Sequence, residues 1–133
     1  MMTPKFAFGS ALFIQALVGS LPVAMASPDD FEFQLVEPKV KQGEDVSVAV
    51  RLIDKRAGHP VADAVIFATR MDMAPDEMES MTTPLVAVLS TVPGIYNFRT
   101  NLVMEGSWRL SIAAKIQGEV GTVENRLILK VVP

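Results

Sequence analysis

Apolar and polar residues alternate along most of the chain beyond residue 30. A period of two is typical of β-strands that bury one face. Val46, Val48 and Val50, for example, alternate with small or polar neighbours, and no stretch has a convincing helical period. The pattern predicts seven strands of five to nine residues, separated by Gly, Pro and Asp turn signals, at residues 31–35, 46–52, 65–71, 85–91, 96–102, 108–116 and 127–131.

Seven short strands in about 100 residues predict an all-β fold, an immunoglobulin-like antiparallel β-sandwich of two sheets. Gly94-Ile95-Tyr96 has the spacing of a tyrosine corner, in which the phenol bonds back to upstream backbone. Trp108 lies in an alternating strand, as the central aromatic residue of a sandwich core does. A small barrel would produce a similar pattern, so strand order and closure stay open. No linker suggests a second domain, and we predict one domain over residues 27–133.

The first 26 residues have a different pattern, with Lys5 followed by an apolar, uncharged stretch over residues 6–18. Ala24-Met25-Ala26 then matches the small-x-small pattern of a cleavage site. We therefore predict a signal peptide over residues 1–26 and export to the periplasm, with no stable membrane insertion after cleavage. The alternative is an uncleaved N-terminal helix that anchors the protein, because residues 6–26 are long enough to span a bilayer.

The charge of the chain and its content of Cys and His exclude several kinds of functional site. The chain of 133 residues has 12 basic and 15 acidic residues, and its net charge changes from −3 to −4 when residues 1–26 are removed. A net-negative chain with scattered Lys and Arg offers no basic face for nucleic acid. There is no cysteine, and His59 is the single histidine. Thiolate sites, His-rich metal sites and most nucleophile–base pairs are therefore excluded, and we expect no enzymatic activity.

Methionines cluster in the chain beyond residue 26, where four of five lie within eleven residues. Thioether sulfur is a soft, neutral ligand that suits Cu(I) and, by the same argument, Ag(I). We predict that the segment after Pro75 is a polar loop that folds back onto the preceding strand. The candidate ligands are Met71, Met73, Met78, Met81 and Met104. Nearby acidic residues would add a negative field that favours a cation, namely Asp72, Asp76, Glu77 and Glu79.

Other interpretations fit the same methionines. Met71 and Met73 continue the inward face of a predicted strand, so they can be core residues. Met78 and Met81 are three residues apart and can form the apolar edge of one helical turn. A flexible methionine-rich surface also suits adaptable contacts with a partner protein, without metal.

Two further residues, His59 and Trp108, could contact a bound metal ion only if the methionines lie close to them. His59 lies in the turn Gly58-His59-Pro60, where a lone histidine is most often solvated, but it is the only imidazole that could join them as a metal ligand. Trp108 would contact a bound Cu(I) through its ring only if Met104 and the segment of residues 71–81 meet at one end of the sandwich.

The chain beyond residue 40 resembles the YtkA-like, or FixH-related, family of exported domains. The motif elements that carry this resemblance are Gly58-His59-Pro60-Val61, Ala64-Val65-Ile66-Phe67, the methionine segment, Pro93-Gly94-Ile95-Tyr96 and Met104-Glu105-Gly106-Ser107-Trp108. The resemblance implies an immunoglobulin-fold module in the cell envelope. It also implies metal handling, with copper- or silver-efflux proteins or oxidase-assembly proteins as partners.

Our leading hypothesis is an exported β-sandwich protein that binds Cu(I) or Ag(I) weakly through methionine sulfur. It would act as a carrier or as an accessory to a copper efflux or oxidase assembly system. The alternative is a non-enzymatic interaction module of the cell envelope, whose methionine-rich segment docks a partner without metal.

Overall fold

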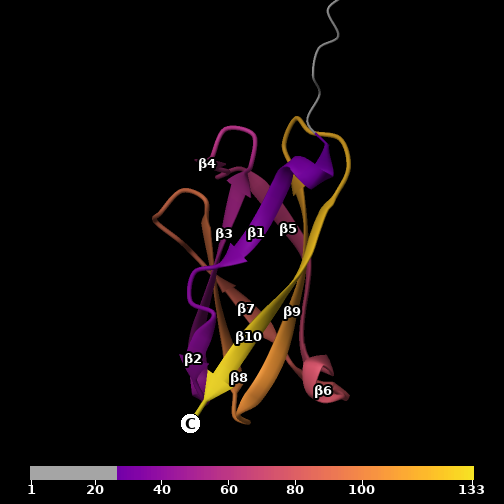
Figure 1. Cartoon of the computed structure of the whole chain (residues 1–133). Helices are drawn as coiled ribbons and strands as arrows, with labels where there is room; N and C mark the ends of the chain where they lie inside the picture. The colour runs from indigo at the N-terminus through magenta and orange to yellow at the C-terminus, as the bar shows by residue number, and fades with distance from the viewer. Residues whose placement is uncertain (1–26) are drawn as a thin grey trace, which may run out of the picture.

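The computed structural model describes residues 27–133, and the predicted signal peptide over residues 1–26 lies outside the described residues. The described part of the chain folds into two facing sheets (Figure 1). No helix in it is long and apolar enough to cross a membrane.

Each sheet has five strands within the described residues. The first sheet contains β1 (Phe31–Leu35), β3 (Gly43–Asp54), β4 (His59–Pro60), β7 (Leu85–Val88) and β8 (Ile95–Leu102). The second contains β2 (Lys39–Lys41), β5 (Ala64–Met73), β6 (Met78–Thr83), β9 (Gly106–Ile116) and β10 (Val123–Val132). Two single 3-10 turns complete the elements, η1 (Pro28–Asp30) and η2 (Ala74–Asp76).

The strand orders are β1-β3-β8-β7, with β4 added beside β3, and β2-β10-β9-β5-β6. All pairings are antiparallel except that of β2 with β10, which is parallel. The long strands β3, β9 and β10 lie inside their sheets, whereas β6 and β7 lie at edges.

The core forms where the inward residues of the two sheets meet. Trp108, Leu110 and Ile112 alternate along β9 and are all buried, as the period of two predicts. The Tyr96 hydroxyl donates to the Val61 carbonyl at 2.7 Å and accepts from the Ala64 amide at 3.2 Å. It therefore binds the segment that crosses from the first sheet to the second.

The predicted all-β, immunoglobulin-like sandwich is confirmed, and each of the seven predicted strands corresponds to an observed one. The described residues contain three further strands, β2, β4 and β6. The strands β2 and β4 are only three and two residues long, too short to show alternation. One pairing departs from the antiparallel pattern, because β2 pairs in parallel with β10.

Candidate functional site

Strand β5 carries Met71 and Met73 into the core. Their side chains are 0% and 1% exposed, and Met71 lies opposite Leu110 of β9. Both face inward because residues two apart on a strand share a face. Core packing accounts for both methionines, and neither is open to solvent.

The segment after Met73 forms η2 and then β6, so the prediction of a polar loop here was wrong. Pro75 lies in η2, where it needs no ladder hydrogen bond. Glu77 adopts the left-handed conformation, with a φ of 62°, and the chain reverses there. Met78 then pairs with Met73, and β6 runs antiparallel to the last residues of β5. The sequence signal for this strand is the pair of β-formers Thr82 and Thr83.

Strand β6 bulges between its two paired ends. Met73 pairs with Met78, but the preceding residue, Asp72, pairs with Thr82. Four steps along β6 therefore match one step along β5, and residues 79–81 leave the regular ladder. Met78 shares a face of the sheet with its cross-strand partner Met73, whereas Met81 lies in the bulge. Both Met78 and Met81 are 37% exposed.

Two aspartates of the methionine segment hold the turn rather than a cation. Oδ1 of Asp72 accepts a hydrogen bond from the Ala74 amide at 2.9 Å, which starts η2. Oδ2 of Asp76 accepts one from the Ser107 amide at 2.9 Å, which ties η2 to the start of β9. Gly106 has a φ of 137°, and a side-chain carbon there would lie 2.4 Å from Oδ2 of Asp76. Only glycine fits this approach without strain.

The Asp72 carboxylate is fully buried and lies between two guanidinium groups. Its Oδ2 is 2.8 Å from Nε of Arg70 and 3.1 Å from Nη2 of Arg109. Burial alone would raise the pKa of Asp72, but the hydrogen bonds from Ala74, Arg70 and Arg109 outweigh it and hold this pKa below its ordinary value. Nη2 of Arg109 also lies 3.5 Å from Oε1 of Glu79. These ion pairs neutralise the predicted negative field at Asp72 and reduce it at Glu79.

Met104 lies in the connection that crosses from β8 in one sheet to β9 in the other. Its carbonyl accepts a hydrogen bond from the Trp108 indole at 3.0 Å, and its side chain is 37% exposed. The buried Trp108 ring thus reaches the connection that carries Met104.

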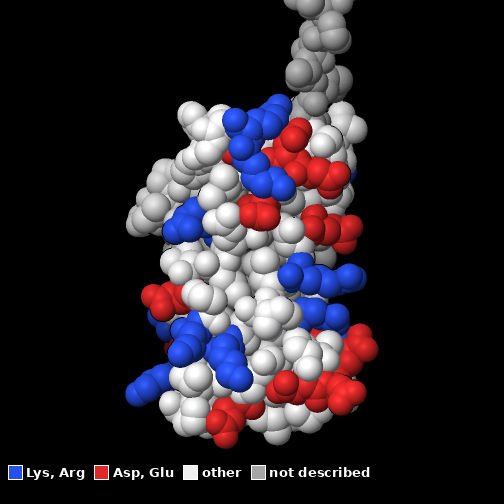
Figure 2. All heavy atoms as spheres, in the orientation of Figure 1, with Lys and Arg blue, Asp and Glu red and all other residues white. Residues whose placement is uncertain are grey.

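Three methionines belong to segments that meet at this end of the sandwich. The terminal methyl of Met73 would lie only 2.8 Å from a side-chain carbon at Gly106, and Met104 is two residues before that glycine. Met78 is the cross-strand partner of Met73. Met73, Met78 and Met104 are called the methionine end below. Figure 2 shows acidic side chains around the part of the surface where Figure 1 places β6.

The structure does not bring His59 to these methionines. Strand β4, which holds His59, lies at the opposite end of the sandwich from β6 (Figure 1). His59 pairs with Asp54 at one end of β3, whereas Leu102, two residues before Met104, pairs with Gly43 at the other end. Twelve residues of β3 separate these points, which corresponds to roughly 35 Å at 3.3 Å per residue.

The donors available at the methionine end are thioethers. Among residues 27–133, no group of three or more His, Cys, Asp or Glu side chains is placed to hold a metal ion. A ligand set of sulfur atoms alone would select soft monovalent cations over hard divalent ones.

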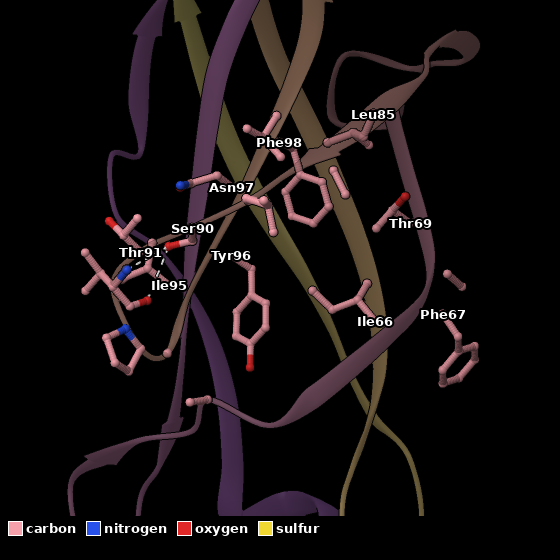
Figure 3. A pocket seen from close by; sticks show the side chains of 18 residues that line it. Ile66, Phe67, Thr69, Leu85, Ser90, Thr91, Ile95, Tyr96, Asn97 and Phe98 are labelled. Atoms are coloured by element: carbon pink, nitrogen blue, oxygen red, sulfur yellow. Dashed lines mark hydrogen bonds between the residues drawn. The ribbon is translucent and has the colours of Figure 1, made fainter.

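A second feature, which the sequence analysis missed, is an apolar groove of about 710 Å³ between β5 and the β7–β8 region. Ile66, Tyr96 and Phe98 point into it, whereas Phe67 lies on the other side of β5 from Ile66 (Figure 3). The sequence signal was residues 65–68, where Val, Ile, Phe and Ala follow one another and alternation fails. Such a run leaves apolar side chains on both faces of the strand.

Comparison with known proteins gives a family for the chain. A model of the YtkA-like family matches residues 25–113. No curated protein matches the chain.

Three solved structures have similar shapes at low sequence identity. The Lin-41 filamin domain is 15% identical, over 82% of this chain and 98% of that chain, with a TM-score of 0.49. The ZirS C-terminal domain is 14% identical, over 93% and 87% of the two chains, with a TM-score of 0.48. Domains 4 and 5 of the S-layer protein SbsC are 19% identical, over 77% and 51%, with a TM-score of 0.42. All three TM-scores are below 0.5, and nothing about function follows from them.

Proposed function

The chain belongs to the YtkA-like family, and from this premise we propose that it is a periplasmic protein that binds Cu(I) or Ag(I) at the methionine end. It would act there as a metal carrier or as an accessory to an efflux or oxidase assembly system. The observation that supports this proposal is that Met73 pairs with Met78 across the strands and has its terminal methyl beside Gly106, two residues after Met104.

Three features of the methionine end support a soft-metal site. Met78 and Met104 are each partly exposed, so a metal ion can reach them from solvent. Met73 is buried and its terminal methyl lies beside Gly106, so a metal ion would reach it only from the side of Met78 and Met104. Neutral sulfur ligands suit a monovalent soft ion and stay competent where thiols would oxidise.

Partial exposure also favours exchange over tight retention. A carrier must release its metal, and exposed thioethers can be replaced one by one by the ligands of an acceptor protein. The role of Met81 is secondary in this proposal, because it lies in the bulge of β6 and not opposite Met73.

The test is a titration of the purified protein with Ag(I), monitored by tryptophan fluorescence, beside an anaerobic Cu(I) competition with a chelator. Trp108 is the single tryptophan of the chain and donates a hydrogen bond to the Met104 carbonyl. A metal ion on Met104 should therefore change its emission. We expect saturation at about one ion per chain, since a site of three thioethers holds one soft ion.

The matched variants keep volume and apolarity while removing sulfur. The double variant M78L/M104L should lose at least tenfold in affinity, whereas M71L, deeper in the core, should bind as the parent does. Equal binding by all three proteins, or no binding by the parent, would reject the site. The exposed methionines would then be examined as a protein contact surface instead.

A further inference from the structure

The apolar groove lies on an open side of the sandwich. Strand β6 pairs only with the last three residues of β5, namely Met71, Asp72 and Met73. Within the described residues, residues 64–70 of β5 therefore have a paired neighbour, β9, on one side only, and the register shifts at Phe67, which has no partner in β9. On the facing sheet, β7 pairs only with β8. The groove occupies the space between these two strand edges.

Among residues 27–133, no charged residue lines the groove. Its walls come from three places, residues 62 and 66–69, residues 85 and 87–94, and residues 95–98. Several apolar side chains around it are exposed, including Leu89 at 95% and Phe67 at 56%. An isolated apolar residue on a surface is ordinary, but apolar residues grouped around a groove mark a binding surface.

The unpaired edge of β5 adds a second requirement for a ligand of the groove, because its backbone groups need hydrogen-bond partners. Backbone N–H and C=O groups along an unpaired strand edge need hydrogen-bond partners when water is displaced. An extended polypeptide supplies these partners in the spacing of a strand. Residues 65–69 contain no charge and no proline, two common protections of an edge strand, and the irregular register at Phe67 is the one interruption of this edge.

We infer that the groove binds an extended segment of a partner protein, added antiparallel to β5 as a further strand. Alternate side chains of this segment are aliphatic and enter the groove toward Ile66, Tyr96 and Phe98. A charge at one end of the open edge sets the direction of the segment. Asp63 precedes residues 64–70, whereas Arg70 at the other end already pairs with Asp72. An antiparallel segment therefore has a basic residue at its C-terminal end, near Asp63.

Two other occupants fit less well. A second copy that paired through its own β5 would keep its inward side chains in its own core, so the groove would stay unfilled. A lipid chain would fill the groove but would leave the backbone groups of β5 without partners. An extended peptide satisfies both the apolar walls and the polar edge.

The test uses a synthetic peptide, acetyl-Asp-Val-Thr-Val-Thr-Val-Lys-amide, and the isotope-labelled protein. Two-dimensional NMR should show saturable shifts in the amides of residues 65–69 and of residues 85–88. A peptide in which the terminal Lys is replaced by Asp should bind at least threefold more weakly. Replacement of the central Val by Pro should weaken binding at least tenfold, because it removes a backbone donor and clashes with a regular strand.

The protein variants test whether the groove itself is used. Ala68→Glu places a charge on an exposed lining residue and should reduce peptide affinity at least tenfold. Ala57→Glu makes the same change in an exposed turn outside the groove and should leave affinity unchanged.

Three results would overturn the inference. One is no saturable shift at millimolar peptide, and another is equal loss of affinity in both variants. The third is a dimer whose contacts cover residues 65–69 in the absence of peptide, which would assign the edge to a second copy. None of these measurements involves metal, so their outcome is separate from that of the methionine end.

Discussion

The two ends of β5 differ in what covers them, although they belong to one strand. Met71 and Asp72 are paired on both sides, by β9 and β6, Met73 pairs with Met78 of β6, and all three are buried. Residues 64–70 are paired on one side only, and Val65 is 66% exposed. The first region is a fixed part of the core, and the second is an open edge beside an apolar groove.

This difference shows that the neighbours of a strand determine the role of its residues more than its own sequence does. Both regions are rich in apolar residues and lie in one ten-residue strand. The buried end is closed because η2 turns the chain back, and because Asp72 binds Arg70 and Arg109 beneath the bulge of β6. The open end has no such return of the chain.

The largest expected contrast between the two regions is in amide hydrogen exchange. Alternate amides in residues 65–70 face the unpaired edge and should exchange through small local openings. Amides of Met71 and Met73 should need a much larger opening, and we expect them to exchange at least about a hundredfold more slowly. Exchange measured by NMR on the protein without peptide tests this. Uniform protection along β5 would mean that something covers the edge.

The fold could be predicted from the sequence because alternation is set by each strand alone. Val46, Val48 and Val50 mark β3 whatever lies beside it, and Gly94-Ile95-Tyr96 predicted the hydroxyl contact to upstream backbone. Strand pairing is set by contacts between distant residues. The register that places Met78 opposite Met73, and the short strand β6 itself, therefore escaped prediction.

The candidate site was predicted only in part for the same reason. The methionine cluster is visible in the sequence, but Met71 and Met73 became core residues, and the crossing from β8 to β9 brought Gly106, two residues after Met104, beside Met73. His59 could not be placed until the pairing of β4 with β3 put it at the other end. The groove has no local motif, because its walls come from both sheets.

Among substitutions, the strongest test of the comparison is Met71→Ala beside Val65→Ala. Met71 is completely buried, and its truncation leaves a cavity, so we expect a loss of about 3 kcal/mol in the free energy of unfolding. Val65 is largely exposed, and its truncation should cost less than about 0.5 kcal/mol. Urea unfolding measures both. Similar losses for the two variants would show that the open end of β5 is packed in solution.

The next effect concerns the ion pairs that close the buried end. Asp72→Asn keeps the shape of the side chain but removes the charge between Arg70 and Arg109, and we expect a loss of about 2 kcal/mol. Asp45→Asn is the matched control, since Asp45 pairs with Arg99 at 3.6 Å on the surface, where such pairs contribute about 0.5 kcal/mol or less. No loss in the free energy of unfolding of Asp72→Asn would mean that backbone hydrogen bonds alone hold β6 against β5.

The contribution of Asp72 should also depend on pH. Its folded-state pKa lies below the ordinary value of 3.8, because the hydrogen bonds from Ala74, Arg70 and Arg109 outweigh the opposing effect of burial. The stabilisation is therefore complete above the unfolded pKa and is lost as the pH falls through the folded pKa. The difference in stability between the parent and Asp72→Asn should be constant near neutral pH and should shrink in acid. A difference that grows on acidification would contradict this sign.

Of the variants expected to lose stability, Tyr96→Phe should lose the least, and it acts at the point where the open part of β5 begins. The phenol hydroxyl binds both the Val61 carbonyl and the Ala64 amide, and its removal should cost about 1 kcal/mol. Burial of the ring raises the pKa of Tyr96, with the charge of Asp63 adding to this and the Ala64 hydrogen bond opposing it. The hydroxyl is therefore protonated and able to donate throughout the neutral range.

Because this contact fixes the start of residues 64–70, Tyr96→Phe should speed the hydrogen exchange of the amides in these residues while leaving those of Met71 and Met73 less affected. Equal acceleration along β5 would instead show that the two regions unfold together, and that the open edge has no separate stability of its own.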